Sequence, residues 1–518
     1  MDWKQLLNNN RLRQSRRDAD ADARNDFESD FGRIIFSSAM RRMHDKTQVF
    51  PLTTDDNIHS RLTHSMEVMA IGYSLGIKLC DNDNFIKTVG TEKKDIHRKI
   101  PILLKNACLV HDIGNPPFGH FGETVIQEYF KNFFDNEREK KKKEKKLDLK
   151  KEEIEDFIYF DGNAQGFRVL TKLQILNDAF GLNLTYGTLA SYIKYPNYKG
   201  IDKANIAKKK RGVFQSEFEY LDKISKACGL NKGVDIVRHP LCFLMEAADS
   251  ICYLVMDLED GFNKGWYSFE EFSNYFNKDT EIIKIINKLK TEHTGKGQEV
   301  TKMVNFRIYL INRLVNLAVD NFTKNLDDIL NGEYNNELIK DDKSELEKLL
   351  TNFCVNKIFP NREITSLELT GHSVLTGLLD YYIKFFFHEN KDYRNKAQGL
   401  ISDSILKVAF LENKDSIFRR RLDELEKQSK ENDKCKTEYD KLNNSLKKLS
   451  ELKSKSNTDE SKKEELRKTE FQILEIVKPH IDDLNDYYKL RVIVDFISGM
   501  TDQFALNHYQ KLSGQKIS

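Results

Sequence analysis

The sequence predicts an all-α protein. Only eight of the 518 residues are proline, and lysine, glutamate and leucine are abundant, which is typical of helical chains. Apolar residues recur at helical spacing over long segments, whereas the short alternating segments that form strands are few. We therefore expect a helical core, a further helical C-terminal region, and charged helical arms inserted into both.

The composition indicates the compartment and excludes some classes of partner. The 83 basic and 81 acidic residues nearly cancel, so no overall field draws the chain to nucleic acid or to a membrane. Seven cysteines without paired spacing indicate free thiols in a reducing compartment. The first residues show no apolar signal region, and no apolar run is long enough to span a bilayer. We expect a cytoplasmic protein with no membrane partner.

The chain begins with a polar segment. Residues 1–26 mix arginine with aspartate, and we expect a solvated N-terminal arm in preference to a clamp for phosphate or nucleic acid. A core is predicted over residues 27–275 and a helical C-terminal region over residues 276–518. Charged insertions are expected at about residues 135–156 and 419–477.

The two insertions differ in pattern. The first contains the lysine-rich run 140–146 and is predicted to be exposed and mobile, with weak binding of single-stranded DNA as a lesser alternative. The second carries leucines at helical spacing, which predicts a protruding helical hairpin. Its apolar stripe is too irregular for a coiled coil.

The segment around residue 111 organises the rest of the chain. An apolar run at residues 102–110 predicts a buried helix that ends on the pair His111 and Asp112, just before Gly114 and two prolines. A buried carboxylate is costly unless it is compensated, and a metal ion suits both a carboxylate and an imidazole. The alternative is that Asp112 caps the next turn and His111 is a core histidine.

Further candidate ligands lie on two other predicted helices. His64 stands near the start of one helical pattern, and Asp249 lies in the apolar helix of residues 241–257. Asp249, Tyr253 and Asp257 recur every four residues and share one face, as a cavity wall requires. The predicted metal ligands are therefore His64, His111, Asp112 and Asp249, around a divalent ion that is Mn²⁺ or Mg²⁺, with Fe²⁺ and Zn²⁺ as alternatives.

Several motifs together resemble one family. RLTHSMEV, HDIGNPPFGHFGE, GNAQG, MEAADSICYLVMDLED and ISGMTD stand in this order, within a region of similarity from about residue 27 to 512. They resemble the bacterial dGTP triphosphohydrolases, within the HD-domain metal phosphohydrolases. The resemblance implies an HD-domain helical core and hydrolysis of dGTP, or other dNTPs, to a deoxynucleoside and tripolyphosphate. It also implies a homo-oligomer, with a hexamer expected.

A second pair of residues fits the proton transfer that this reaction needs. His120 and Glu123 stand three residues apart at the start of a predicted helix, where the carboxylate can fix the imidazole tautomer and raise its basicity. A sugar 5′ alkoxide leaves poorly unless it is protonated, so we expect His120 to act as the general acid. The alternative for Glu123 is a first-turn acid favoured by the helix dipole.

The resemblance also implies contacts to the substrate. Gln48 is expected to face the sugar, and Arg61 the triphosphate or the base. Tyr253 and Asp257 resemble the residues that test the 3′ hydroxyl and exclude a 2′ hydroxyl. Asn163 is expected to bind substrate, because it keeps the family pattern.

Cations near residue 200 are candidates for a triphosphate clamp. Lys194 is preferred because it lies in a motif-like context, and the cluster at residues 208–211 is a weaker candidate that equally fits an ordinary surface. Tyr159 and Asp161 stand where the family usually has His and Glu, which questions any phosphate or proton role at those two positions.

Two other functions compete with this interpretation. Another HD phosphohydrolase, acting on guanosine tetraphosphate or a cyclic nucleotide, would share the metal ligands. It would not explain the His120 pair together with the Asp249 face. A non-catalytic regulator that binds nucleotide or nucleic acid is disfavoured by the intact ligands and the near-zero net charge.

Overall fold

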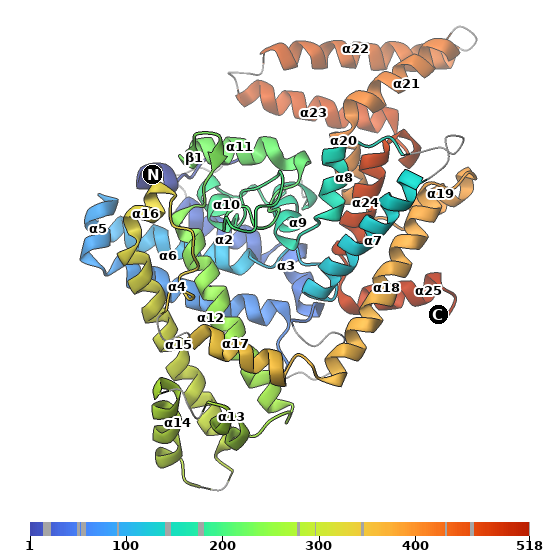
Figure 1. The fold of residues 1–518 in the computed structure, drawn as a ribbon. Coiled ribbons are helices and arrows are strands. Elements are labelled where there is room, and N and C mark those ends of the chain that lie inside the picture. Colours follow the sequence, from blue (N-terminus) through green and yellow to red (C-terminus); the bar gives the residue numbers. More distant parts are fainter. Residues whose placement is uncertain are drawn as a thin grey trace.

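A computed structural model of the chain describes residues 1–13, 22–48, 52, 58–90, 93–139, 147–174, 181–276, 280–295, 297–342, 346–429, 433–455 and 460–516. These residues are overwhelmingly helical, which confirms the predicted fold class (Figure 1). The only strands among them are the short antiparallel pair β1 (Asn231–Lys232) and β2 (Asp235–Ile236).

The helices follow one another along the described chain, and the longest described connection, residues 193–214, joins α10 to η3. In the first half they are α1 (Trp3–Leu6), α2 (Asp26–Ile35), α3 (Ser38–Arg42), η1 (Met43–Asp45), α4 (Arg61–Cys80), α5 (Asp83–Val89), α6 (Lys93–Val110), α7 (Gly119–Glu139), α8 (Lys151–Ile158), α9 (Gly162–Arg168), η2 (Val169–Leu173), α10 (Tyr186–Tyr192), η3 (Gln215–Glu217), α11 (Phe218–Ala227) and α12 (Pro240–Asn263). In the second half they are α13 (Phe269–Tyr275), α14 (Thr280–Glu292), α15 (Glu299–Lys324), α16 (Leu326–Asn331), α17 (Leu346–Lys357), α18 (Arg362–Phe386), α19 (Lys391–Gln398), α20 (Asp403–Glu412), α21 (Lys414–Gln428), α22 (Asp433–Lys455), α23 (Glu460–Val477), η4 (Ile481–Asp483), α24 (Asp486–Ser498) and α25 (Asp502–Leu512).

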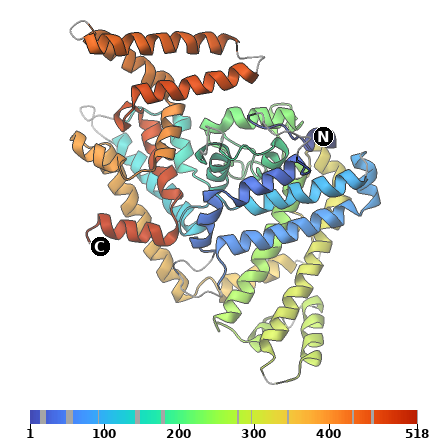
Figure 2. The same ribbon diagram turned by 180° about the vertical axis from the view of Figure 1, so that it is seen from behind.

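Helices α4, α6 and α12 pack against one another in the centre of the molecule (Figures 1 and 2). Two glycines of α4 allow α6 to approach closely. A Cβ at Gly72 would lie 2.3 Å from the sulfur of Cys108, and a Cβ at Gly76 would lie 2.7 Å from the Cα of Pro101. This close packing sets the end of α6, where His111 follows, beside the start of α4, where His64 lies.

Two apolar clusters form the interior. The first contains the buried faces of α4, α6 and α12 together with residues of α15 and α17, and the second contains residues of α7, α18, α20 and α24. Each cluster draws on both sides of the predicted boundary at residue 276. The division into a core and a C-terminal region therefore stays a prediction.

The prediction of a solvated N-terminal arm is wrong for residues 1–13. Trp3 and Leu6 are buried, and the terminal amino group donates to the carbonyl oxygen of Leu330 at 2.8 Å. Arg11 is buried as well and donates to Asp30 at 2.5 Å. The many charges of this segment predicted exposure, but two apolar side chains and one buried ion pair hold it against the core. Residues 14–21 lie outside the described part.

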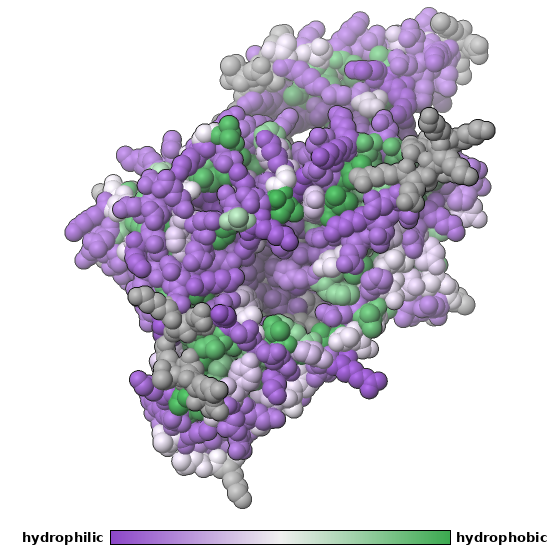
Figure 3. Space-filling view, viewed as in Figure 1, coloured by the Kyte–Doolittle hydropathy of each residue, from purple (hydrophilic) through white to green (hydrophobic). Residues whose placement is uncertain are grey.

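The charged insertions are partly helical. The lysine run 140–146 lies outside the described residues, but α8 takes up the end of the predicted first insertion and buries Asp156. In the second insertion α22 and α23 pack on each other as a helical hairpin, and α21, which leads into the hairpin, packs on α22. Figure 3 shows that the surface of this arm is mostly hydrophilic. Within the described ranges, no helix is long and apolar enough to cross a membrane.

Candidate active site

Three of the predicted metal ligands meet at one point. His64 lies in the first turn of α4, His111 directly follows α6, and Asp249 lies in the middle of α12. Asp249 Oδ1 is 3.3 Å from His64 Nε2 and 3.4 Å from His111 Nε2. One ligand atom from each of the three residues lies within 4.8 Å of the other two.

The two imidazoles are oriented by their other ring nitrogens. His111 Nδ1 is 2.8 Å from the carbonyl oxygen of Cys108, so it donates there and leaves Nε2 as the acceptor. His111 Nε2 is buried and has no hydrogen-bond partner within the described residues. His64 Nδ1 faces the sulfur of Met256 at 3.4 Å. Two imidazole nitrogens and a carboxylate, with one of the nitrogens lacking a hydrogen-bond partner, fit a divalent cation.

Asp112 stands beside this cluster. Its Oδ1 is 3.5 Å from His111 Nε2, and its Oδ2 accepts a hydrogen bond from the guanidinium of Arg61. Burial alone would raise the pKa of Asp112, but His111 and Arg61 outweigh it and lower that pKa. Burial would likewise lower the pKa of His111, whereas Asp112 and Asp249 raise it to about 9. The cluster is rich in negative charge, as a cation site requires.

His120 and Glu123 form a second pair in the first turn of α7. His120 Nδ1 is 3.0 Å from Glu123 Oε2, and the amide of Gly162 donates to Glu123 Oε1 at 2.7 Å. The His120 side chain is 74% exposed, whereas that of Glu123 is 5% exposed. The carboxylate raises the pKa of His120, first by its charge and then by the hydrogen bond. Glu123 thus holds the ring so that Nε2 is free.

The turn before α7 needs glycine. Phe118 and Gly119 both adopt left-handed backbone angles, with φ of 63° and 60°. A Cβ at Gly119 would lie 2.2 Å from a guanidinium nitrogen of Arg61. This glycine therefore lets Arg61 pass beneath the start of α7 and reach Asp112.

These groups face one cavity of about 580 Å³, which is lined by residues from both apolar clusters. Ten predicted site residues line it: Gln48, Arg61, His111, Asp112, His120, Asn163, Lys194, Asp249, Tyr253 and Asp257. His64 and Glu123 lie behind the wall, where they contact Asp249 and His120. The structure therefore brings all the predicted site residues together, and their roles stay predictions.

The cationic groups divide between the cavity and the surrounding structure. Lys194 Nζ lies 3.3 Å from Glu246 and 3.9 Å from Asp249. In the cluster at residues 208–211, only Lys210 lines the cavity, with its Nζ 3.0 Å from Asp161 and 3.9 Å from Glu123. The other three do not line it: Lys208 pairs with Asp235, Arg211 with Asp156, and Lys209 with Glu337, a carboxylate of the cavity wall. The sequence marked the cluster but carried no signal for which lysine turns inward.

The far end of the cavity is built by α12. Asp257 is 6% exposed, and burial together with nearby Asp260 raises its pKa to about 8. It is therefore mostly protonated at neutral pH and can donate a hydrogen bond. The Tyr253 hydroxyl donates to Glu347 at 3.4 Å. Sequence reasoning missed Glu337, Phe359 and Glu368, which line the same end, because nothing in their local pattern distinguishes them from other helix residues.

The departure at residue 161 has a structural consequence. Asp161 caps α9, and its Oδ1 accepts from both the backbone amide and the side-chain amide of Asn163, at 2.8 and 2.7 Å. Asp161 and Tyr159 do not line the cavity. The aspartate thus acts by fixing Asn163 and Lys210.

Known proteins are similar to this chain along nearly its whole length. An HD domain matches residues 61–160, and a phosphohydrolase-associated domain matches residues 466–511. A deoxyguanosinetriphosphate triphosphohydrolase-like protein of Listeria innocua is 33% identical over 99% of this chain and 100% of its own length. One of Synechocystis is 35% identical over 74% of this chain and 86% of its length. A deoxyguanosinetriphosphate triphosphohydrolase of Salmonella paratyphi A is 30% identical over 94% and 93%.

Proposed function

This chain belongs to the deoxyguanosinetriphosphate triphosphohydrolase family of HD-domain phosphohydrolases, and on that premise we propose that it cleaves dGTP, or other dNTPs, to the deoxynucleoside and inorganic tripolyphosphate. One observation carries the proposal. The cluster that fits a divalent ion and the His120 pair face the same cavity, together with inward-pointing cations. A deoxynucleotide whose α-phosphate sits at the cluster would place its 5′ oxygen within reach of an acid.

The cations of the wall are suited to bind the phosphates. A triphosphate carries about four negative charges near neutral pH and needs convergent cations. Lys194, Lys210 and Arg61 supply them from three different segments. Lys194 and Lys210 now face carboxylates at 3.3 and 3.0 Å, which keeps both amines charged until a phosphate competes for them.

His120 is suited to move the proton. Because Glu123 holds Nδ1 of this cavity-lining ring, the proton for the leaving 5′ oxygen would come from Nε2. The charge of Glu123 and its hydrogen bond raise the pKa of His120, which favours the protonated ring that a general acid needs. When bound at His64, His111, Asp112 and Asp249, a divalent ion supplies Lewis-acid polarisation of a phosphoryl oxygen. Mn²⁺ or Mg²⁺ is the ion we propose.

Sugar recognition is assigned to the α12 end. Tyr253 and Asp257 are spaced one helical turn apart and both line the cavity, so they can meet a 3′ hydroxyl and crowd a 2′ hydroxyl. Gln48 Oε1 is buried without a partner among the described residues, which suits an acceptor that awaits a sugar hydroxyl. Asn163 faces the same cavity.

Product analysis tests the proposal. Full-length protein with Mn²⁺ is incubated with each dNTP and each rNTP, and phosphorus NMR follows the products. We expect free tripolyphosphate from dGTP, with little from GTP. Release of orthophosphate or pyrophosphate instead, or no turnover of any dNTP with Mn²⁺ demonstrably bound, would refute the proposal. The expected homo-oligomer, a hexamer, is checked on the same sample by light scattering.

A further inference from the structure

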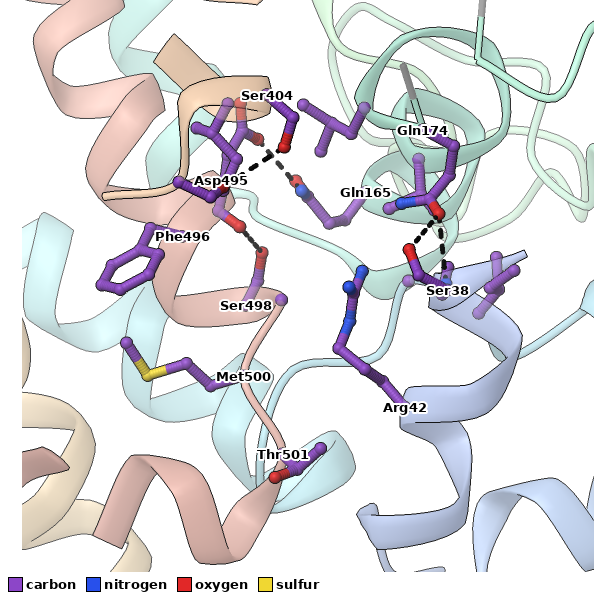
Figure 4. Close-up of a pocket in the computed structure, with 18 of the residues that line it drawn as sticks. Ser38, Arg42, Gln165, Gln174, Ser404, Asp495, Phe496, Ser498, Met500 and Thr501 are labelled. Atoms are coloured by element: carbon purple, nitrogen blue, oxygen red, sulfur yellow. Dashed lines mark hydrogen bonds between the residues drawn. The ribbon is translucent and has the colours of Figure 1, made fainter. Parts of the chain in front are cut away.

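A second cavity lies on the other side of the segment that carries the metal ligands. It has a volume of about 390 Å³ and is lined by residues of α3, α9, η2, α20 and the end of α24 (Figure 4). Ile113 and Gly114 form part of its wall, whereas His111, Asp112 and Asn115 line the catalytic cavity. Residues 111–115 therefore separate the two cavities.

The charge of this second cavity is positive. Arg42 extends from α3 into it toward Gln165, and within the described part of the chain it has no carboxylate or hydrogen-bond partner. Lys46 also lines the cavity, and its Nζ donates to the carbonyl oxygens of Asn115 and Ser498 at 2.5 and 2.9 Å. The one carboxylate of the wall, Asp495, is already bound by Arg168 and Arg491 at 2.8 and 3.2 Å.

The remaining wall joins apolar surface to hydroxyl and amide groups. Phe496 and Met500 lie across the cavity from Arg42, and Val169, Leu173 and Ile405 add to the apolar side. Ser38 and Gln174 stand near Arg42, where the hydroxyl of Ser38 already donates to Gln174 Oε1 at 2.8 Å. This combination fits an amphipathic anion, whose charge meets the guanidinium and whose ring lies on the apolar side.

We propose that this cavity is a second ligand site, which takes an organic phosphate monoester, of the size of a nucleoside monophosphate, with Arg42 as its phosphate-binding residue. One free guanidinium matches most of the one to two negative charges of a phosphate monoester near neutral pH. The Lys46 amine behind it adds a partial charge, because burial and the nearby Arg42 lower the pKa of Lys46 to about 7. The four or so charges of a triphosphate would be left partly unpaired. A ligand here touches Ile113 and Gly114, directly behind the metal-binding pair.

Calorimetric titration of metal-free, full-length protein with guanosine 5′-monophosphate tests the site without turnover, so its result is independent of the catalytic proposal. The decisive variant is Arg42→Gln, and the matched control is the neighbouring Arg41→Gln. Arg41 is exposed and donates to the carbonyl oxygen of Phe36 at 3.0 Å. We expect binding to weaken at least 10-fold in the Arg42 variant and less than 2-fold in the Arg41 variant. Lys194→Gln, in the catalytic cavity, should bind like the wild type.

Three outcomes would overturn the site. They are no binding of the nucleotide by the wild type, equal binding by the Arg42 variant, and loss of binding in the Lys194 variant, which would place the nucleotide in the catalytic cavity. A thermal-shift series guards against misfolding. Arg42 has no hydrogen-bond or carboxylate partner to lose among the described residues, so the Arg42 variant should melt no lower than the wild type. The nucleotide should raise the melting temperature of the wild type but not that of the variant.

Discussion

One group of buried charges gathers around Arg168 at the end of α9, another lies around Asp249 in the catalytic cavity, and the two differ in how they are paired. In the first, Arg168 donates to Asp495, Glu217 and Glu412 at 2.9, 2.6 and 2.7 Å, and Lys172 donates to Glu412 at 2.5 Å. In the catalytic cavity the contacts are longer, from 3.3 to 3.9 Å around Asp249. His111 Nε2 there has no hydrogen-bond partner among the described residues.

The difference distinguishes charges that stabilise the fold from charges that are available to a ligand. The charges around Arg168 satisfy one another, and they join α9 to α20 and α24, so they serve the fold. Those around Asp249 remain partly unpaired, as a site that awaits a ligand requires. Removing a charge should therefore affect stability in the first group and activity in the second.

The largest effect is expected for Asp249→Ala. Without this carboxylate the two imidazoles lose their shared partner, and activity should fall at least ~1000-fold, or about 4 kcal/mol. Metal content, measured by atomic emission, should drop to background. Asp257→Ala on the same helix is the matched control and should keep its metal. Equal loss of metal in both variants would refute the division of roles along α12.

Arg168→Met should have the opposite effect: a loss of stability with the metal content retained. Removing one partner of a buried network leaves its carboxylates uncompensated, which costs about 3–5 kcal/mol of unfolding free energy. Denaturant unfolding measures this loss. Metal content per folded molecule should stay near the wild-type value. A variant as stable as the wild type would show that this network does not hold α20 and α24 to the core.

His120→Gln is expected to lower kcat about 100-fold, because the leaving oxygen loses its acid. Metal content should be unchanged, and so should the KM within about threefold, since the ring contributes to proton transfer rather than to binding. Glu123→Gln should show a smaller loss, because the imidazole remains but is less basic. An unchanged kcat in His120→Gln would assign the proton to another group.

The smallest effect concerns pH. The folded state holds Asp257 neutral, with a pKa of about 8 against an ordinary value of 3.8. Because the folded state binds this proton more tightly than the unfolded chain, its contribution to stability is present below about pH 4 and is lost as the pH rises through 8. Asp257→Asn should therefore gain stability relative to the wild type as the pH rises from 4 through 8. Melting curves from pH 4 to pH 9 measure it, and an unchanged difference across that range would contradict it.

The sequence predicted the helical fold and the residues of the cavity better than it predicted their partners. His64, His111 and Asp249 could be predicted, because their motifs fix both the residue type and its position on a helix. The inward positions of Lys210 and Arg42 could not be predicted, because a run of basic residues does not indicate which side chain turns inward. The N-terminal segment was misjudged because the burial of Trp3 depends on distant helices that local polarity does not report.

The most direct test of the central claim is hydrolysis of dGTP in ¹⁸O-labelled water, followed by phosphorus NMR. Attack at the α-phosphorus, with His120 protonating the departing 5′ oxygen, places the label in tripolyphosphate and none in the deoxynucleoside. We expect an isotope shift on a terminal phosphorus of tripolyphosphate. Label in orthophosphate or in the nucleoside would show that the cavity breaks a different bond and would contradict the account.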